Sequence, residues 1–469
     1  MNEFDPNACD DYNSCLTRRQ FMGTSAGALA VATGAAGVIP GWRPKLAFAN
    51  PSSPCPNHVF IFLHLNGGPD GLSMVIPYGD ERLHGTSDPL RPFDGPLGVP
   101  PPDYTGGEPK TIDLDGFFGL APALADLKPA WDDGGLCIAS ALALTGQSYS
   151  HFTAFRWLGL GYPNSAANAV DGFMANHLNT IGGCGGVLRG VSLTNAVLKP
   201  LFGADAVLPI PDLTNFQIGG PSGSAAARLD VLDAMYNQQN KLDLWKDIST
   251  TTKASINLLD TLDLGNYTPT PGSNYGTSTL DNTLKTLAGL IKADVGLEMA
   301  TASYGGWDTH QNQRNNIPGG NMWNNMITLS RAVGAFYHDL INDPGPTRSF
   351  TLFIMGEFGR IAKPNDLTDP LLAGTDHGYG TNAFFVGNKI NGGQVINAGL
   401  WPGLDVLHTT NHTCNVTNTR DVCATTDPRD LLVEIFDRLL CNYDNLSTIF
   451  PDPAYSIPTP PNYQGIVRA

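Results

Sequence analysis

The stretch "LEMATASYGGWDTH", residues 297–310, decides the fold class and raises the question of function. Its first eight residues are mostly small or apolar and are typical of a buried β-strand, which breaks at Gly305 and Gly306. Asp308 and His310 then follow, two positions apart. Because residues two apart in an extended segment point to the same side, these two side chains can ligate one ion.

Similar apolar runs recur along the chain and alternate with segments of helical periodicity. The runs are "HVFIFLHL" (58–65), "GLCIASALAL" (135–144), "FTLFIMGEF" (350–358) and "TNAFFVGN" (381–388). Helices are predicted over "LDNTLKTLAGLI" (280–291), from its apolar spacing, and from "DPRDLLVEIFDRLL" (427–440), with Asp427 as N-cap and Pro428 at the first helical position. This alternation predicts an α/β domain with a largely parallel sheet.

Two regions interrupt the alternation. Residues 76–112 are rich in Pro, Gly and Asp, and we expect an ordered surface loop of the kind that often serves function. Residues 220–265 predict one or two helices with polar faces, followed by the linker "GNYTPTPGSNYG". We therefore expect a helical insertion or cap over the sheet at 220–276, within a single domain covering residues 50–469.

Composition excludes some classes of partner. The 469 residues are 42% hydrophobic, enough for a full-sized core. They carry 43 Asp and Glu against 27 Lys and Arg, a net charge of −16. This acidic balance argues against a nucleic-acid partner or an anionic membrane surface. An anionic substrate would need a locally positive or metal-bearing site.

The N-terminus resembles a twin-arginine export signal. Arg18 and Arg19 precede a run of small, weakly apolar residues, and Ala47, Phe48 and Ala49 form a cleavage tripeptide, with cutting expected after Ala49. The alternative is a membrane anchor, but the Ala, Gly and Thr content makes a poor hydrocarbon span. We expect recognition by the twin-arginine translocase, removal of residues 1–49, a periplasmic or extracellular location, and no membrane span in the mature chain.

The mature chain would keep six cysteines, some of which should pair in an oxidising compartment. Cys414 and Cys423 flank the short loop "CNVTNTRDVC" and are the best candidates for a bridge, although six cysteines allow fifteen full pairings. No CxxC or Cys/His spacing favours a zinc site at these cysteines.

Four of the predicted strands run into polar clusters. These are "NGGPDG" with Asn66 and Asp70, "TGQSYSHF" with Ser150 and His151, "GGWDTH" with Asp308 and His310, and "GEFGR" with Glu357 and Arg360. Open α/β sheets bind ligands outside the carboxyl ends of their strands, so these clusters are placed to converge. Carboxylates with imidazoles suit zinc, manganese, magnesium or calcium, and His377 in "GTDHGYG" is the further ligand that we expect.

Several of these residues also have an ordinary structural interpretation. Ser150 stands where a loop opens a helix, so it can be a nucleophile or simply an N-cap. Glu357 and Arg360 can form an ordinary surface ion pair of small worth. His151 can be a packed helix residue instead of a ligand.

The order NGGPDG, SHF, GGWDTH, GEFGR and TDHG behind a twin-arginine signal resembles the domain-of-unknown-function family 1501, often described as sulfatase-like, over most of residues 56–445. That family is similar to the alkaline phosphatase superfamily, which implies a mixed, mostly parallel sheet between helices and hydrolysis or transfer of phosphate or sulfate esters with two metal ions. The resemblance implies a first metal at Asp308, His310 and His377. It implies a second at Glu357 with Asp70 or Asn66, a nucleophile at Ser150, and His151 and Arg360 beside it.

Three departures from the superfamily pattern weaken the assignment of these metal-binding and nucleophile roles. The superfamily usually spaces its Asp and His by four residues, Phe358 replaces a metal-binding histidine, and Ser150 lacks the context of a sulfatase formylglycine. Two functions therefore remain open. One is an exported metal-dependent hydrolase or transferase that acts on a small-molecule or glycan ester. The other is a non-catalytic envelope protein with a degenerate metal site that binds a glycan or protein partner.

Overall fold

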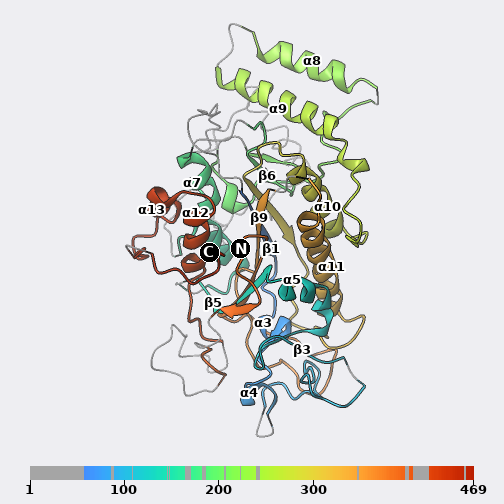
Figure 1. Cartoon of the computed structure of the whole chain (residues 1–469), viewed down its shortest axis with the longest axis vertical. Helices are drawn as coiled ribbons and strands as arrows, with labels where there is room; N and C mark the ends of the chain where they lie inside the picture. Colours follow the sequence, from blue (N-terminus) through green and yellow to red (C-terminus); the bar gives the residue numbers. More distant parts are fainter. Residues whose placement is uncertain are drawn as a thin grey trace, which may run out of the picture.

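A central mixed sheet organises the computed structural model. The structure describes residues 58–85, 89–107, 109–144, 146, 148–163, 171–181, 186–204, 207–221, 223–238, 243–345, 348–396, 401–404, 422–458 and 461–468. Within this part of the chain the sheet has eight strands in the order β11-β5-β10-β9-β1-β8-β6-β7. Strands β1, β5, β6 and β9 of this sheet are labelled in the middle of the molecule in Figure 1. Their bounds are β1 His58–Leu65, β5 Leu136–Leu142, β6 Gly190–Ser192, β7 Val207–Pro209, β8 Met299–Tyr304, β9 Ser349–Met355, β10 Thr381–Val386 and β11 Gln394–Ile396.

The sheet is mostly parallel. Strand β1 pairs in parallel with β8 and with β9, and β6 with β7 and β8. Strand β10 runs antiparallel to both of its neighbours, β5 and β9. The prediction of an α/β domain with a mostly parallel mixed sheet is therefore confirmed, and each of the five predicted apolar runs contains a strand of this sheet.

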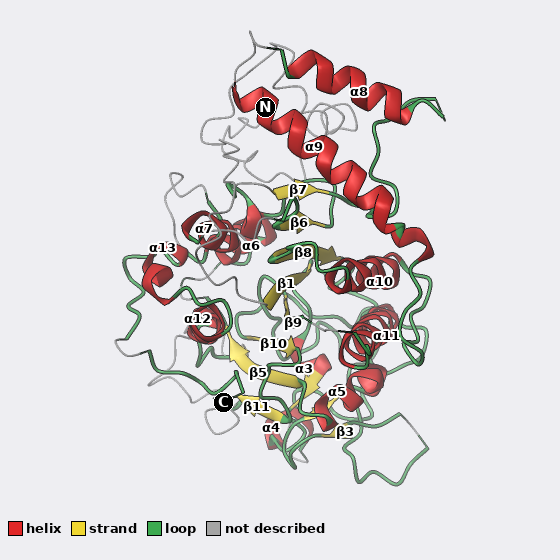
Figure 2. Ribbon diagram, turned by 45° about the horizontal axis from the view of Figure 1, so that its top comes forward, coloured by secondary structure: helices red, strands yellow, loops and turns green. Residues whose placement is uncertain are grey.

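Helices cover both faces of the sheet (Figure 2). The side chains of β1 alternate: Val59, Ile61 and Leu63 join one core, whereas Phe60 and Phe62 join the other. The first core packs against α10 (Thr279–Lys292), α11 (Asn321–Ile341) and the 3-10 helix η2 (Pro122–Leu127). The second packs against α7 (Phe173–Thr180), α12 (Pro428–Arg438) and α13 (Leu446–Ile449).

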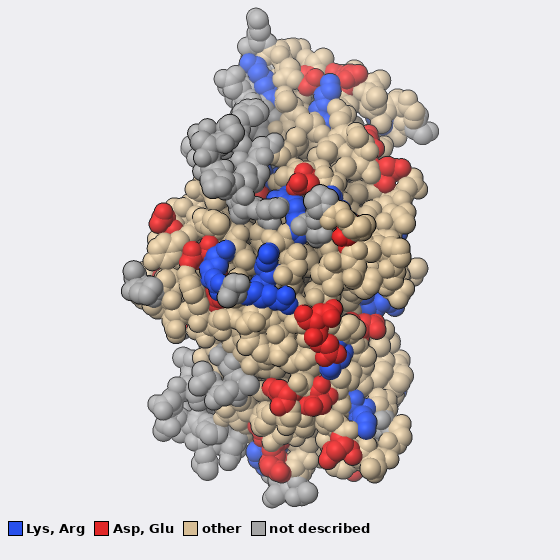
Figure 3. All heavy atoms as spheres, in the orientation of Figure 1, with Lys and Arg blue, Asp and Glu red and all other residues tan. Residues whose placement is uncertain are grey.

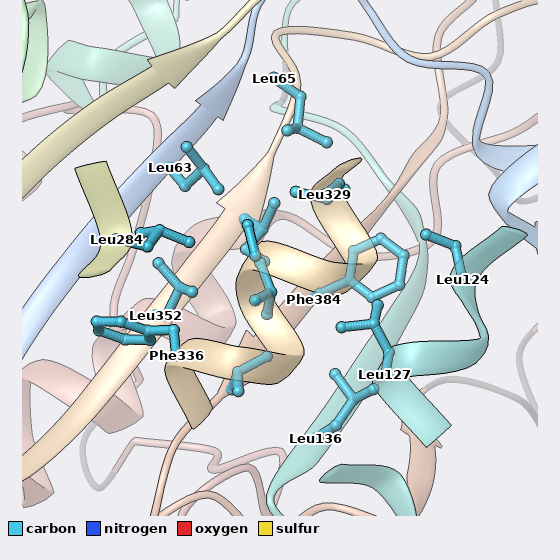
Figure 4. Close-up of a cluster of buried hydrophobic side chains, with 14 of the residues drawn as sticks. Leu63, Leu65, Leu124, Leu127, Leu136, Leu284, Leu329, Phe336, Leu352 and Phe384 are labelled. Atoms are coloured by element: carbon cyan, nitrogen blue, oxygen red, sulfur yellow. The ribbon is translucent and has the colours of Figure 1, made fainter. Parts of the chain in front are cut away.

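Figure 4 shows the first core, where Leu63 and Leu352 from neighbouring parallel strands meet Leu284 of α10 and Phe336 of α11. Helix α10 covers the predicted segment and begins with a capping box at Ser278 and Asp281. Helix α12 begins as predicted, because the side chain of Asp427 accepts a hydrogen bond from the backbone N–H of Arg429.

The remaining elements are short, apart from one helical pair. They are α3 (Gly71–Met74), β2 (Val75–Ile76), α4 (Glu81–His84), β3 (Ile112–Asp113), β4 (Gly119–Leu120), α5 (Lys128–Asp132), α6 (His151–Leu160), η3 (Lys199–Leu201), η4 (Leu264–Asn266) and η6 (Tyr443–Asn445). The predicted long loop at 76–112 contains only α4 as a helix, among its described residues. The insertion forms two helices, α8 (Ala225–Tyr236) and α9 (Asp243–Leu262), which pack together beside the β7 edge of the sheet (Figure 2).

On the face shown in Figure 3, acidic and basic side chains are scattered over a mostly uncharged surface. Among the described residues, no helix combines the length and apolarity that a membrane crossing requires. The twin-arginine segment and Cys414 lie outside the described residues. Export and the bridge between Cys414 and Cys423 therefore remain predictions.

Candidate functional site: a cluster of three histidines around Asp308

The loops that carry the predicted site residues meet at one edge of the sheet. The parallel strands β1, β5, β8 and β9 end at this edge. Because β10 runs the opposite way, its beginning lies there too, and the segment before it, with His377, reaches the same place. An isolated antiparallel bridge joins Arg360 to His377.

Asp308, His310 and His377 come together as predicted. Oδ1 of Asp308 lies 3.0 Å from Nε2 of His310 and 3.2 Å from Nε2 of His377. The two imidazole Nε2 atoms are 3.0 Å apart. Three potential ligand atoms, drawn from loops that are 67 residues apart in sequence, therefore form a small triangle.

His151, the first residue of α6, completes the cluster. Its Nε2 lies 3.5 Å from Oδ2 of Asp308, and its ring centroid is 4.5 Å from that of His377. His151, Asp308 and His377 offer ligand atoms that all lie within 4.8 Å of one another. The Nε2 of His151 is buried and has no hydrogen-bond partner among the residues that the structure describes. The alternative that His151 is merely a packed helix residue therefore does not account for its position.

Each of the three imidazoles is anchored through its other ring nitrogen. Nδ1 of His151 lies 2.6 Å from Oε1 of Glu357, and Nδ1 of His310 lies 2.8 Å from Oδ1 of Asp376. Nδ1 of His377 lies 2.8 Å from the backbone carbonyl of Tyr149. Ionised carboxylates and carbonyls only accept hydrogen bonds, so each Nδ1 carries the proton and donates it. In the neutral imidazoles, the Nε2 lone pairs are left facing Asp308.

The pKa values of the acids support this assignment. Burial would raise the pKa of Glu357, but hydrogen bonds from His151 and His64 outweigh it and hold the pKa far below its ordinary value. The hydrogen bond from His310 lowers the pKa of Asp376. Burial opposes ionisation of Asp308, yet the hydrogen bond from Arg360 and the nearby His377 lower its pKa. All three carboxylates are therefore ionised at neutral pH.

Lone pairs that face one another and a carboxylate repel unless a cation lies among them. The hydrogen bond to Glu357 raises the pKa of His151. A divalent metal ion among these atoms would relieve the repulsion. Zinc with nitrogen and oxygen ligands at about 2.0–2.1 Å in a tetrahedron separates those ligands by about 3.3 Å. The triangle of Asp308, His310 and His377 matches this spacing. The group of His151, Asp308 and His377 could hold a metal ion.

The donor set also discriminates among metals. Calcium and magnesium prefer oxygen ligands, whereas imidazole suits zinc and other transition metals. A hydrogen-bond acceptor on the opposite ring nitrogen is typical of metal-binding histidines. Of the four metals considered from the sequence, zinc and manganese fit three imidazoles and one carboxylate better than magnesium and calcium do.

Glu357 occupies a different role from the predicted one of metal ligand. Its side chain is fully buried and accepts hydrogen bonds from His64, His151 and the backbone N–H of Gly67. These contacts engage both of its oxygens, and the one with His151 orients that imidazole. It does not pair with Arg360, so the alternative of a surface ion pair between them is wrong.

Arg360 lies beneath the cluster and not on a substrate-facing surface. It is 1% exposed, and its guanidinium donates to the carbonyls of Gly67, Gly68 and Thr375 and to Oδ1 of Asp308. These bonds tie the loops after β1, β8 and β9 together. Arg360 therefore positions Asp308, and the prediction that it acts directly in catalysis is not supported by its burial.

Asp70 does not join the cluster. Its fully buried carboxylate pairs with Arg91 at 2.7 Å and accepts hydrogen bonds from Ser73 and Gln313. The Arg91 charge and these bonds lower the pKa of Asp70 against the effect of burial. Asn66 is exposed at the end of β1, and its backbone N–H donates to the carbonyl of Tyr304. Asp70 contributes no atom to the His151, Asp308 and His377 group.

Ser150 is the N-cap of α6. Its Oγ accepts a long hydrogen bond, 3.5 Å, from the backbone N–H of Thr153, and the side chain is otherwise exposed. The cap interpretation is thus confirmed, although it does not prevent a second role. Ser150 stands between Tyr149, whose carbonyl anchors His377, and His151, so its backbone is tied to the cluster on both sides.

Sequence reasoning missed the residues that orient the histidines. His64, near the end of β1, holds Glu357 through Nε2 at 2.9 Å and stacks on Phe155. Asp376 precedes His377 and was available in the sequence, but its acceptor role toward His310 depends on a contact between loops 66 residues apart. A histidine inside an apolar strand was the one available signal for His64.

The cluster defines a class of protein: an α/β domain with a candidate mononuclear metal centre built from strand-end loops. Residues 224–443 match the model of a family described as "Protein of unknown function (DUF1501)". The matched segment contains Asp308, His310, Glu357 and His377, and it supports the resemblance to that family. No curated protein matches the chain.

Proposed function

We propose that the chain is an exported, zinc-dependent hydrolase or transferase of phosphate or sulfate esters, with an alkaline phosphatase-like fold. The observation that carries the proposal is the set of three imidazoles, each anchored at Nδ1, whose Nε2 atoms face Asp308. The mostly parallel sheet between helices, with the cluster at the ends of its strands, is consistent with that fold.

Under this proposal His151, Asp308, His310 and His377 hold the ion, which supplies Lewis acidity toward an ester oxygen. Arg360 fixes the orientation of Asp308, while Glu357 and Asp376 fix two of the imidazoles. The ring of Phe358 packs against the rings of His151 and His377, at 4.9 and 4.6 Å between centroids, and excludes water from that side.

Ser150 is the proposed nucleophile because it is exposed and directly precedes His151. The start of α6 also presents backbone N–H groups and the positive end of a helix dipole, which favour the negative charge of an ester oxygen. The function as an N-cap uses only a lone pair of Oγ, so the hydroxyl proton remains available for transfer.

A second candidate is a non-catalytic envelope protein with one structural metal that binds a glycan or a protein partner. Two observations favour it: Phe358 is buried where the superfamily has a ligand, and Ser150 already serves as a helix cap. Turnover of an ester substrate by the purified protein decides between the two candidate functions.

The test has two stages. Elemental analysis of the purified mature protein should find tightly bound zinc, and a metal-free protein would refute the proposal. The zinc-loaded protein is then assayed on phosphate and sulfate esters of p-nitrophenol, with Ser150→Ala and Ser148→Ala as a matched pair. We expect turnover that Ser150→Ala abolishes and Ser148→Ala retains. Zinc without turnover of any ester would favour the non-catalytic candidate.

Export is proposed from the twin-arginine signal and has its own test. Replacing Arg18 and Arg19 together by Lys should leave the uncleaved precursor in the cytoplasm, because the paired arginines are the recognised feature. Normal cleavage and export of that variant would contradict the proposed periplasmic or extracellular location.

A further inference from the structure

The buried side chain of Gln313 links the two loops that supply three of the proposed metal ligands. Its Oε1 accepts a hydrogen bond of 3.0 Å from the hydroxyl of Thr309 and one of 2.9 Å from the hydroxyl of Thr375. Thr309 stands between the two proposed ligands of the loop after β8, and Thr375 comes two residues before His377. One oxygen atom therefore joins residues that neighbour the ligands in both loops.

The other end of the Gln313 amide is fixed as well. Its Nε2 donates to Oδ2 of Asp70 at 2.7 Å and to Oγ of Ser73 at 3.2 Å, and Arg91 pairs with the same carboxylate. Because a carboxylate that pairs with an arginine only accepts hydrogen bonds, the amide nitrogen faces Asp70 and the oxygen faces the threonines. The side chain thus connects three segments of the chain, those after β1, after β8 and before β10.

The backbone on both sides of Gln313 adopts an unfavourable conformation. Asn312 and Arg314 have positive φ angles of 51° and 47°. Residues with a Cβ rarely adopt this left-handed region, and they keep it where the surrounding contacts require it. Two such contacts are hydrogen bonds of the Gln313 backbone: its N–H donates to the carbonyl of Ala373, and its carbonyl accepts from the N–H of Met322. The fold therefore specifies the place of this amide.

This bridge bears on metal binding because the ligands of both loops are themselves partly exposed. The side chains of Asp308 and His310 are 46% and 41% exposed, whereas Gln313 and Thr375 are fully buried. Loops that must be ordered when a ligand binds reduce its affinity, and a link that already holds them removes that cost. The backbone N–H of Thr375 also donates to the carbonyl of Thr309, at the same junction.

We propose that Gln313 is a positioning residue of the metal centre, which orders the loops of Asp308 and His377 by joining Thr309 to Thr375. The inference rests on the proposed metal-dependent function. Gln313 does not contact the ion, and its effect passes through the two threonines. Its replacement should therefore change the affinity and the coordination geometry of the metal, and not only the stability of the fold.

The first test is Gln313→Met, which keeps the length of the side chain and removes its hydrogen bonds. Zinc affinity is measured by competition with a chromophoric chelator, and geometry by the visible spectrum of the cobalt(II) protein. We expect zinc to bind about tenfold more weakly, the lower end of the range for groups that orient a metal ligand, and the cobalt spectrum to change.

Asn442→Leu is the matched control. Asn442 is 3% exposed, and its amide nitrogen bonds to His177 and Thr180 of α7, on the face of the sheet that α12 also covers. This variant should lose stability and keep the zinc affinity and cobalt spectrum of the wild type. Unchanged zinc affinity in folded Gln313→Met, or an equal loss in the Asn442→Leu control, would overturn the positioning role.

Thr309→Val and Thr375→Val test the route, and they do so even if Gln313→Met does not fold. Each removes one hydroxyl that bonds to Gln313, and each should weaken zinc binding. Combined with Gln313→Met they should add no further loss, because the bonds are already absent. Fully additive losses, or unchanged affinity in both folded threonine variants, would contradict the proposal. A wild-type protein that binds no zinc would instead refute the proposed function on which it rests.

Discussion

Asp70 and Asp308 follow neighbouring strands of the same sheet, and the sequence predicted both as metal ligands, yet their surroundings differ. Asp70 is fully buried, and Arg91, Ser73 and Gln313 satisfy its carboxylate. The side chain of Asp308 is 46% exposed and faces the Nε2 atoms of three imidazoles. A satisfied buried acid maintains structure, whereas an acid surrounded by unprotonated nitrogens has a site for a cation.

The largest expected effect is on metal binding at Asp308. Asp308→Ala should weaken zinc binding by at least about 100-fold, beyond the usual effect of removing a group that only orients a ligand, because it removes the only carboxylate of the proposed donor set. Asp308→Asn keeps an acceptor for Arg360 and controls for loss of fold. Zinc affinity is measured by competition with a chromophoric chelator. Unchanged zinc affinity in the folded Asn and Ala variants would show that Asp308 is not a metal ligand and that its contrast with Asp70 is wrong.

The corresponding change at Asp70 should act on stability. Asp70→Ala leaves the buried guanidinium of Arg91 without its carboxylate partner, and the free energy of unfolding should fall by about 3–5 kcal/mol. Urea denaturation measures it. The control is Asp132→Ala, which breaks the exposed pair with Lys128 and should cost below about 1 kcal/mol. If Asp70→Ala instead lost zinc at unchanged stability, Asp70 would be a ligand after all.

A smaller effect on zinc binding is expected at Asp376, which contacts the ligand His310 and not the ion itself. Asp376→Asn exchanges the ionised acceptor of the His310 Nδ1 proton for a neutral amide and should weaken zinc binding about 10–100-fold. Asp366→Asn removes the same charge from an acid that only bonds its own turn, so it should leave zinc affinity unchanged. Equal losses in both variants would indicate a general charge effect instead of orientation of His310.

The smallest effect is expected at Ser150. Ser150→Ala removes the cap of α6 and should lower the free energy of unfolding by no more than about 1 kcal/mol, since the hydrogen bond to Thr153 is long. Zinc affinity should not change. Both changes in stability are measured by thermal unfolding. Ser278→Ala, which removes half of the capping box of α10, should lower the free energy of unfolding by more than Ser150→Ala does. A loss of zinc in Ser150→Ala would place the hydroxyl among the ligands.

The strands, helix caps and strand-end position of the site were predictable because they depend on local pattern. Apolar runs bounded by glycines predicted β1, β5, β8, β9 and β10, and the polar residues after them marked the functional edge. The spacing of Asp308 and His310 indicated a shared ion, and their side chains do meet at 3.0 Å. These inferences require only the two-residue periodicity of extended chain and the polarity of strands that end at a surface.

Which polar residues face one another was not predictable in this way. Glu357 and His151 are 206 residues apart, and their contact turns the acid from an expected ligand into the group that orients the imidazole. The burial of Asp70 depends on Arg91, which lies in the long loop where no periodic pattern guides prediction. Such pairings arise from the packing of loops, which local sequence does not encode.

By itself, the sequence determined an acidic α/β chain with an N-terminal segment resembling an export signal, buried strands and a polar edge where those strands end. The tertiary structure decided that β10 runs antiparallel, which brings His377 beside Asp308. It also decided which nitrogen of each imidazole is bonded and which is left facing Asp308. Local residue preferences set the elements, whereas the direction of a strand and the partners of its loops depend on free energies summed over the whole fold.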